Sequence, residues 1–433
     1  MPMITRNRIK ISERQIALMW QRLVGKGLTS AEGEPIKVIY PGRINGDNGP
    51  DFKDAVIVNE SNLMKGDVEV HVKSSDWYGH RHHGDAGYNG VILHIVGWHD
   101  CNSATLLQNG KLVPVLCLSK QACLKPYRLS CFQILGHMDK QTLGRLLNTA
   151  GEQRFKQKTM HFQAKMQWTE AGQVLFQGVM RALGYSKNII PFEELAHRLP
   201  LNFIERVEPG GSLVLKEAWL LGTAGLLPSQ RAKGEFPQGE EIRRLEQLWQ
   251  SVDKEAETMR ENDWNFSHIY PNNSPVRRII AQSYLLQRYH ERGLLMGTLQ
   301  LVKEAPTARH LEDGLIVFGD GYWQDHYDFD GRCKTRTSAL LGCSKAGEIV
   351  VNVLLPFTFS WGKVAEEPEL KEKAIKLYLN YPKLAENEIT RHMVRQLCLE
   401  DVSDFTACHQ QGLIHIFRSY CREGRCSQCP LDS

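Results

Sequence analysis

The spacing of apolar residues changes near residue 135, and this change restricts the folds open to the chain. Before it, a helical pattern is followed by short runs in which polar and apolar residues alternate, as in half-buried strands. After it, apolar residues recur mainly at helical spacing. We therefore predict an α+β protein, with an N-terminal α/β domain containing a mixed sheet over residues 1–135. A larger, mainly helical domain should follow over residues 136–433 and end in a cysteine cluster.

Individual elements follow from the same patterns. An amphipathic helix with Ser12 as its N-cap should span Ile11–Val24. The predicted strands are Ile36–Tyr40, Ala55–Val58, Asp67–Lys73, Val91–Val96 and Leu112–Leu118. The predicted later helices are Lys140–Lys158, Thr169–Leu183, Gly211–Leu226, Glu240–Asp253, Val276–Tyr289, Leu294–Val302, Glu369–Leu379, Glu386–Cys398 and Thr406–Tyr420. An apolar, partly β-type pattern interrupts them at Leu315–Phe318 and Ile349–Phe357.

Composition excludes several classes of protein. The 433 residues are 42% apolar and 24% charged, which is typical of globular domains and not of disordered chains. A net charge of +4 excludes a protein that coats nucleic acid by bulk charge, but it allows a local basic groove. We expect no signal peptide, because no apolar segment of secretory type follows the short basic stretch Met1–Lys10. We expect no membrane span, because no apolar run approaches about 18 residues. The 11 cysteines are irregularly spaced, which favours a reducing, cytoplasmic location.

The segment from Gly49 to Lys73 carries the most unusual chemistry. Pro50 and Asp51 open one predicted strand, and Asn59–Lys65 should connect it to the next in a hairpin. Alternate residues of a strand share one face. In the second strand, one face is suited to a core and consists of Val68, Val70 and Val72. The opposite face consists of Asp67, Glu69, His71 and Lys73.

Such a strand has two explanations: a half-exposed strand with solvated charges, or one wall of a metal site. Mg²⁺ and Mn²⁺ prefer oxygen ligands and Mg²⁺ keeps several waters, so Asp51 and Glu69 could supply the protein ligands. His71 or Lys73 could then position or deprotonate an attacking water. We predict Asp51, Glu69, His71 and Lys73 as the catalytic residues.

This arrangement resembles the PD-(D/E)xK superfamily of phosphodiesterases, which has a restriction-endonuclease-like fold. Pro50-Asp51 matches the Pro-Asp that opens one strand of that motif, and Glu69-Val70 matches the start of its second element. His71 stands where the motif has Lys, and Lys73 lies on the same face one pleat further along. The resemblance covers about the first 120 residues. It implies a nuclease-like core that binds Mg²⁺ or Mn²⁺ and acts on nucleic acid.

The chain also looks like an uncharacterised bacterial family that is catalogued only as a domain of unknown function. The segments behind this likeness are Gly49–Phe52, Gly66–His71, Asp76-Trp77, Tyr88-Asn89, Val91–Val96, Glu217–Gly222 and Asn352–Phe357. This second resemblance implies no activity, so any mechanism must be argued from the residues themselves.

A histidine-rich loop follows the hairpin. It contains Asp76, Trp77, His80, His82 and His83, and His94 lies in the next predicted strand. The loop could be an exposed polar segment. It could instead contact phosphate beside the hairpin, with Asp76, Trp77, His80 and His82 positioning the substrate. A third possibility is a transition-metal centre formed by His71, Asp76 and His94.

The C-terminus carries three closely spaced cysteines, Cys421, Cys426 and Cys429. Cys426 and Cys429 have the spacing of a metal-binding pair, and Cys421 precedes them by a glycine-containing turn. We predict a structural Zn²⁺ or an iron–sulfur cluster here. Free thiols and a redox pair are the alternatives.

The leading functional hypothesis is a metal-dependent, nuclease-like phosphodiesterase that acts on nucleic acid. The first alternative is a catalytically degenerate nucleic-acid-binding or scaffold protein with the same core. The second alternative is a zinc or iron hydrolase that uses the histidine loop.

Overall fold

The computed structural model describes residues 12–21, 23–60, 62–101, 103–120, 138–206, 212–232, 239–251, 257–267, 269–329, 339–397, 399, 403–423, 425 and 428–431. It divides into two compact units. The sheet unit comprises residues 1–150, 386–403 and 411–433, and the helical unit comprises residues 151–385 and 404–410. The sequence analysis places a single boundary near residue 135. In the structure, the chain returns to the sheet unit twice near its C-terminal end, with residues 386–403 and 411–433.

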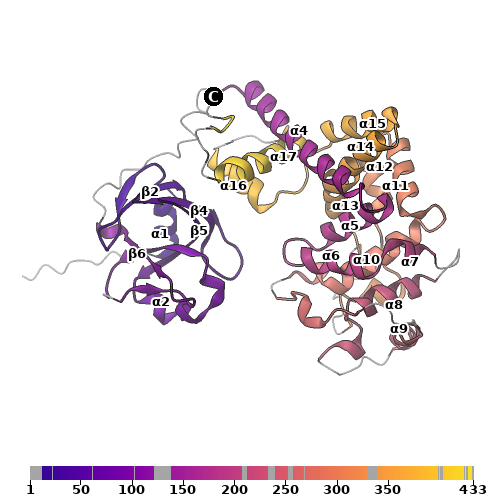
Figure 1. The fold of residues 1–433 in the computed structure, drawn as a ribbon, viewed down its shortest axis with the longest axis horizontal. Helices are drawn as coiled ribbons and strands as arrows, with labels where there is room; N and C mark the ends of the chain where they lie inside the picture. The colour runs from indigo at the N-terminus through magenta and orange to yellow at the C-terminus, as the bar shows by residue number, and fades with distance from the viewer. Residues whose placement is uncertain are drawn as a thin grey trace, which may run out of the picture. The chain divides into compact units, whose positions relative to one another are not determined.

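The sheet unit begins with the predicted helix, α1 (Glu13–Trp20), which Ser12 caps through a hydrogen bond from the Gln15 N–H. A mixed seven-stranded sheet follows, with the order β1-β2-β4-β5-β6-β9 and with β3 paired to β4 (Figure 1). Its strands are β1 (Gly27–Thr29), β2 (Pro35–Tyr40), β3 (Arg43–Ile44), β4 (Phe52–Asn59), β5 (Asn62–Lys73), β6 (Val91–Trp98) and β9 (Val115–Cys117).

The strand directions define the topology of the sheet. β1, β2, β3, β4 and β5 are joined by antiparallel pairs, whereas β6 runs parallel to β5 and β9 runs parallel to β6. A short helix, α2 (Asp76–Gly79), and two 3-10 turns connect β5 to β6. Along the chain, the order in the main sheet is therefore a helix, five strands in antiparallel pairs, a helical connection and two parallel strands. The predicted mixed sheet is confirmed at this level.

Two sequence predictions about the strands are corrected. The hairpin connection was expected to span Asn59–Lys65, but Asn59 pairs with Asn62, so the connection is much shorter. The predicted strand Leu112–Leu118 is split at Pro114 into β8 (Leu112–Val113) and β9. The first piece pairs with β7 (Thr105–Leu106) in a separate small sheet, because proline has no N–H with which to continue a ladder.

The main sheet has an apolar face and a polar face. Ile16 and Trp20 of α1 pack with Val68, Val70 and Ile95, and all five side chains are almost fully buried. Val72 is partly buried against the same cluster, so the predicted valine face of β5 is the core face. The opposite face carries Glu69 and His71 and is covered by the connection between β5 and β6.

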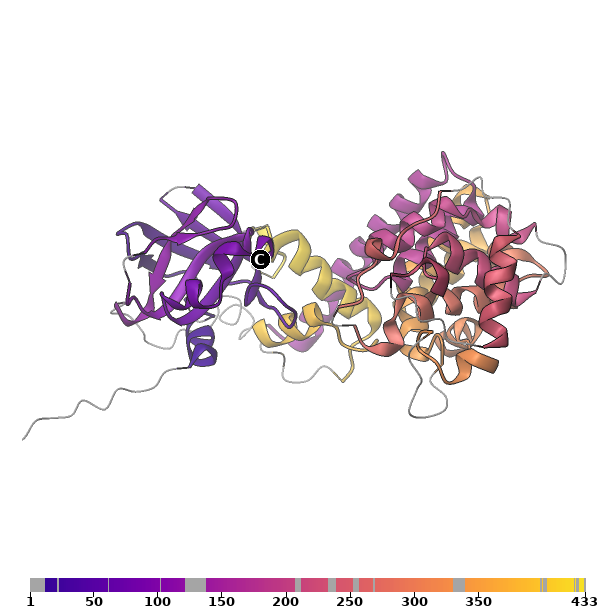
Figure 2. The same cartoon turned by 90° about the horizontal axis from the view of Figure 1, so that it is seen from below.

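Ion pairs join the C-terminal segments of the sheet unit, whose ribbon is yellow in Figure 2, to its strands. Arg43 Nη1 lies 2.6 Å from Glu388 in α16 (Glu388–Gln396). Lys65 contacts Glu423 at 2.5 Å, and Arg422 contacts Asp54 at 3.0 Å.

The second unit is helical, as predicted, and its core is one large apolar cluster. Its longer helices are α5 (Ala171–Leu183), α6 (Ile189–Arg198), α8 (Leu213–Thr223), α9 (Glu240–Gln250), α10 (Pro275–Arg288), α11 (Gly293–Glu304), α12 (Ala308–Leu315), α14 (Leu355–Val364) and α15 (Pro368–Leu379). Shorter ones are α7 (Leu201–Glu205) and α13 (Cys343–Ile349), while α4 (Lys140–Lys165) and α17 (Ala407–Ile416) have residues in both units.

The β-type pattern at Ile349–Phe357 is the clearest error of the sequence analysis. The segment is helical throughout: α13 ends at Ile349, Val350–Leu354 forms a π-helical turn, and α14 begins at Leu355. Its apolar residues are buried on most sides, and complete burial removes the periodicity that separates a strand from a core helix. In the described residues, no helix is both long enough and apolar enough to cross a bilayer.

Candidate functional site

The hairpin brings Asp51 and Glu69 together at the edge of the polar face. Phe52 pairs with Val68, so the two acidic residues are opposite each other one step further along. The Asp51 N–H donates to Glu69 Oε2 at 3.0 Å, and the Val70 N–H donates to Asp51 Oδ2 at 3.0 Å. A bulge follows at once, with Asp54 at a φ of +61°, so the paired register shifts directly after this contact.

The electrostatics of Asp51 reflect its acidic neighbour. Much of the residue is accessible to solvent, whereas Glu69 is only 5% exposed. Packing around the carboxyl group and the negative charge of Glu69 raise the pKa of Asp51 to about 7, against the opposing effect of the Val70 N–H. A proton on Asp51 or a cation bound beside it would relieve this repulsion.

His71 lies next to Glu69 on the same face and begins a buried chain of hydrogen bonds. His71 Nδ1 is 2.9 Å from His94 Nε2, and His94 Nδ1 is 2.9 Å from Thr105 Oγ1. His71 is 1% exposed, and His94, which is paired with Glu69 in the β5–β6 register, is fully buried. Burial and the neighbouring imidazoles lower the pKa of His71 to about 2 and that of His94 to about 3. Both rings are therefore neutral near pH 7.

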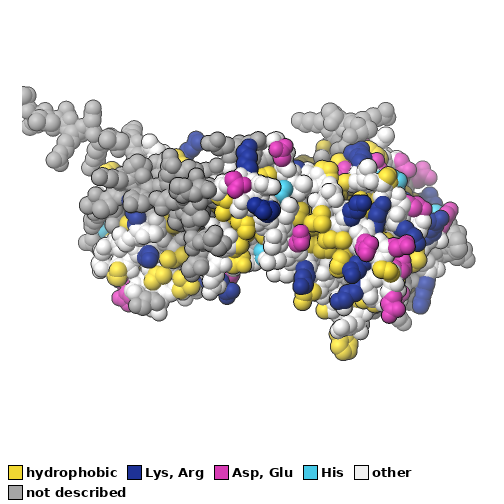
Figure 3. Space-filling view, turned by 90° about the horizontal axis from the view of Figure 1, so that it is seen from above, with side chains coloured by type: hydrophobic (Ala, Val, Ile, Leu, Met, Phe, Trp, Pro, Cys, Tyr) yellow, Lys and Arg dark blue, Asp and Glu magenta, His cyan; other side chains and the backbone are white. Residues whose placement is uncertain are grey.

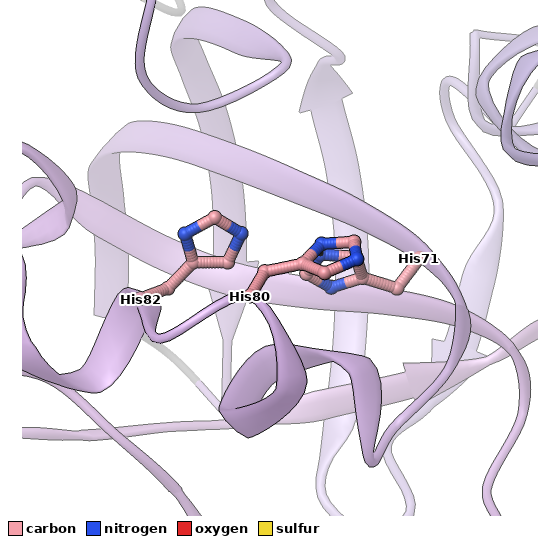
Figure 4. Close-up of side chains that lie close together, drawn as sticks. All are labelled: His71, His80 and His82. Atoms are coloured by element: carbon pink, nitrogen blue, oxygen red, sulfur yellow. Dashed lines mark hydrogen bonds between the residues drawn. The ribbon is translucent and has the colours of Figure 1, made fainter.

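The connection after β5 folds over this face and brings two more histidines to it. Trp77 of α2 is fully buried and donates its indole N–H to Leu106 O at 3.0 Å. His80 ends α2, and His82 begins a 3-10 turn. Between them, Arg81 has a φ of +62°, a left-handed conformation that costs energy for a residue with a side chain. This reversal brings both neighbouring histidine rings close to His71 (Figure 4).

Glu69 and the three histidines form one compact cluster. The ligand atoms of His71, His80 and His82 all lie within 4.8 Å of one another, and His71 Nε2 is 3.1 Å from His80 Nδ1. Glu69 Oε1 lies 3.5 Å from His71 Nε2 and 3.4 Å from His82 Nε2. Three nitrogens and one oxygen are ligands suited to first-row transition ions. Among the described residues, His71, His80 and His82 have ligand atoms close enough together to hold one metal ion.

The remaining predicted site residues lie at the margin of the cluster. The Asp76 carboxylate accepts the Lys73 N–H at 2.9 Å, so it closes the turn after β5. The Lys73 side chain is 56% exposed and reaches Asp100 only at 4.0 Å. At the other end of the polar face, Asp67 is paired with Lys53 at 2.7 Å. The structure therefore brings Asp51, Glu69, His71, His80 and His82 together.

The cysteine cluster is only partly described. Cys421 is 6% exposed at the end of a π-helical turn, where the Gln396 side-chain amide approaches its sulfur at 4.0 Å. Cys429 is partly exposed, and Cys426 lies outside the described residues. The predicted Zn²⁺ or iron–sulfur site at these cysteines therefore stays a prediction.

Three residues near the site were not singled out from the sequence. Glu13 of α1 contributes to the raised pKa of Asp51, Lys53 occupies the bulge beside it, and Thr105 ends the chain from His71. Lys53 carried a signal, because it stands two residues after Asp51. Thr105 carried none, because the small sheet that presents it has no recognisable sequence pattern.

Comparison with known proteins gives one match. Residues 13–387 match the model of a family described as "Protein of unknown function (DUF2851)". No curated protein and no solved structure gives a significant match. The expected likeness to a family of unknown function is thereby confirmed.

Proposed function

We propose that this chain, which belongs to the DUF2851 family of proteins of unknown function, is a metal-dependent phosphodiesterase that acts on nucleic acid. The observation that carries the proposal is the contact between Asp51 and Glu69 across β4 and β5. It places two carboxylates at one end of the sheet's polar face, beside a neutral histidine.

The carboxylate pair fits a hard divalent cation. Asp51 and Glu69 offer oxygen ligands, and their mutual repulsion, visible in the raised pKa of Asp51, is relieved when a positive charge binds between them. Bound Mg²⁺ or Mn²⁺ would polarise a phosphoryl oxygen and lower the pKa of a water. His71 is better placed than Lys73 to orient that water, because its Nε2 lies 3.5 Å from Glu69 Oε1, whereas the Lys73 amine lies among exposed groups.

The order of elements supports the choice of reaction. A helix, an antiparallel hairpin carrying Pro50-Asp51 and Glu69, and a following parallel strand agree with the order expected from the PD-(D/E)xK resemblance. His71 in place of Lys is the departure from that motif. Lys53 brings a positive charge to the same face, where its amine is 2.7 Å from Asp67.

Nucleic acid is the proposed substrate because exposed basic residues are close to the site in the sequence. Lys73 follows His71 in β5, Arg81 lies between His80 and His82, and both are exposed, so their charges suit a phosphate backbone. The helical unit offers no comparable focus on the face shown in Figure 3, where Lys and Arg side chains are mixed with Asp and Glu. Trp77 is fully buried, so it serves as a wall of the site and not as a stacking platform.

The test is a cleavage assay on single- and double-stranded DNA and RNA with Mg²⁺ or Mn²⁺. We expect Asp51→Asn and Glu69→Gln each to lower the rate by at least about 100-fold, because even partners of metal ligands contribute 10- to 100-fold. Asp67→Asn is the matched control on the same strand face, and it should remain active. Absence of cleavage by the wild type on all four substrates, or full activity in Glu69→Gln, would overturn the proposal.

A second candidate, the degenerate nucleic-acid-binding protein, is favoured by the presence of His71 where the motif has Lys. It is distinguished by binding measurements on the Asp51→Asn/Glu69→Gln double variant. Binding without cleavage in the wild type, unchanged in this variant and falling steeply with salt, would support it.

A further inference from the structure

Glu69 has two carboxylate oxygens, and they face different partners. Oε2 accepts the Asp51 N–H, whereas Oε1 faces the nitrogens of His71 and His82. The site proposed above uses the side toward Asp51 and shares His71 with the side toward the histidines. Metal binding on the histidine side is measured without nucleic acid, so its test is distinct from the cleavage test.

Hydrogen bonding accounts for only some of the atoms on the histidine side: His71 Nε2 has a partner in His80 Nδ1 at 3.1 Å, but Glu69 Oε1 and His82 Nε2 have no close partner there. A charge-assisted N–H···O bond is about 2.7–2.9 Å long, but Glu69 Oε1 is 3.5 Å from His71 Nε2 and 3.4 Å from His82 Nε2. His82 Nε2 is buried and makes no hydrogen bond to any described residue. Buried polar atoms are normally paired, so an unpaired nitrogen facing a carboxylate oxygen requires a further partner.

We infer that Glu69, His71, His80 and His82 form a binding site for one divalent first-row transition ion, with Zn²⁺ the best match. Ligand atoms about 2.0–2.1 Å from a tetrahedral ion are about 3.3 Å from one another. Three pairs are close to that value: His71 with His80 at 3.1 Å, and Glu69 Oε1 with His82 and His71 at 3.4 and 3.5 Å. The ligand atoms of the three histidines lie within 4.8 Å of one another, and Glu69 lies beside two of them. This ligand set differs from the sequence prediction, because His80, His82 and Glu69 take the places of Asp76 and His94.

The surroundings hold the rings for this purpose. His82 is stacked between two rings, with its centroid 3.9 Å from Tyr88 and 5.2 Å from His71. Arg81 keeps its left-handed conformation in the turn that joins His80 to His82. Strained backbone of this kind persists where the surrounding structure requires it.

One direction of the hydrogen-bond chain through His94 and Thr105 gives His71 the tautomer that can bind a metal. When His94 Nδ1–H donates to Thr105 Oγ1, its Nε2 accepts from His71 Nδ1–H, and the lone pair of His71 Nε2 faces the cluster. The opposite direction of the chain would place a proton on His71 Nε2 and exclude a metal. Metal-bound histidines commonly donate their other N–H to such a partner, so His94 is a positioning residue of the inferred site.

His80 provides access to the site. Glu69 and His71 are buried, but His80 is exposed, so an ion can enter from its side. An exposed ligand also leaves room for a water on the ion.

The experiment measures metal binding by the full chain without nucleic acid or Mg²⁺. The C-terminal cysteines could hold a second ion, so all proteins carry Cys426→Ser and Cys429→Ser. In this background we expect one equivalent of Zn²⁺ after dialysis and a visible Co²⁺ spectrum without thiolate charge-transfer bands. The double variant His80→Ala/His82→Ala should bind Zn²⁺ at least about tenfold more weakly.

His83→Ala is the matched control, because His83 is in the same 3-10 turn but contacts Tyr78 instead of the cluster. It should bind Zn²⁺ like the parent protein. Both substituted histidines lie in the connection outside the strands, so circular dichroism should show folded protein. The inference fails if the parent binds no Zn²⁺, or if His80→Ala/His82→Ala binds it as tightly as His83→Ala does. Neither outcome affects the cleavage test.

Discussion

Both units bury charged and polar side chains, but they satisfy them differently. In the helical unit, Arg278 is 5% exposed and donates to Leu340 O, to Tyr185 Oη at 2.9 Å and to Asn273 Oδ1 at 2.7 Å. Lys345 forms an ion pair with Glu348, and its amine lies 3.4 Å from the centroid of the Tyr185 ring. These donors meet carbonyl groups, a hydroxyl group, a carboxylate and a π-face, so the chain itself supplies most of their partners, although Arg278 Nε has none among the described residues.

In the sheet unit, buried polar groups face one another with fewer close hydrogen bonds. Glu69 Oε1 lies 3.5 and 3.4 Å from the Nε2 atoms of His71 and His82, and the negative charge of Glu69 raises the pKa of Asp51. A proton or a cation from outside the chain would stabilise such a cluster. The contrast teaches that burial of charge alone does not identify a functional site. The match between donors and acceptors separates a structural network from a binding site.

The largest effect is expected on the free energy of unfolding when Glu217 of α8 is replaced. Glu217 is 4% exposed and tests whether buried charge in the helical unit is structural. Burial raises its pKa from 4.5 to about 8, despite a hydrogen bond from Trp323. Between these values, the folded protein holds a proton that the unfolded chain releases, so stability falls as pH rises. Glu217→Gln keeps the acceptor for Trp323 and should be about 3 kcal/mol more stable than the wild type at pH 7.

Urea unfolding at acidic and neutral pH checks this prediction, with the exposed Glu372→Gln as the control. The difference in midpoint between Glu217→Gln and the wild type should grow as pH rises, while Zn²⁺ binding and cleavage stay unchanged. Loss of either activity in the folded Glu217→Gln protein would mean that the buried charge of the helical unit is functional, and the comparison would break.

An intermediate effect is expected at His94 in the sheet unit. His94→Asn removes the partner of His71 Nδ1 without touching a ligand, so Zn²⁺ affinity should fall about 10- to 100-fold. Thr105→Val keeps the shape of the side chain and should lower affinity less, in the same direction. Calorimetric Zn²⁺ titration of both variants, after circular dichroism has verified folding, gives the answer. A folded His94→Asn protein with wild-type affinity would show that His94 only fills the core.

The smallest effect is expected at Lys73, which was predicted from the sequence to be catalytic. Its amine is 4.0 Å from Asp100 and mostly exposed, so Lys73→Ala should change the cleavage rate by less than about threefold. Lys111→Ala, which removes another exposed charge from the same unit, is the control. A loss near that of Glu69→Gln, seen in kcat and not in KM, would instead make Lys73 the residue that orients water.

The sequence predicted correctly the site residues that lie in one regular strand, β5. Strand alternation alone placed Glu69 and His71 on the face opposite Val68 and Val70, and the hairpin brought Asp51 beside them. The positions of His80 and His82 depend on the left-handed backbone conformation of Arg81. An arginine in the sequence does not indicate that conformation. The choice of ligands could therefore not be made from spacing, although the histidine-rich loop was recognised.

The fold shows the same division between local and distant causes. Ser12 predicted the start of α1, and Pro114 could have predicted the break between β8 and β9. The helical state of Ile349–Phe357 depends on burial by residues distant in the sequence. The association of Glu388 and Glu423 with the strands likewise depends on contacts between residues more than 340 positions apart.

That association has a consequence for how the protein is made. The sheet unit is completed by residues 386–403 and 411–433, so the helical unit is encoded between two parts of its neighbour. During synthesis the first 150 residues leave the ribosome long before Glu388 and Glu423 are added. The ion pairs of Arg43 with Glu388 and of Lys65 with Glu423 therefore form late. Unlike chains whose domains are finished one after another, this one finishes its first domain last.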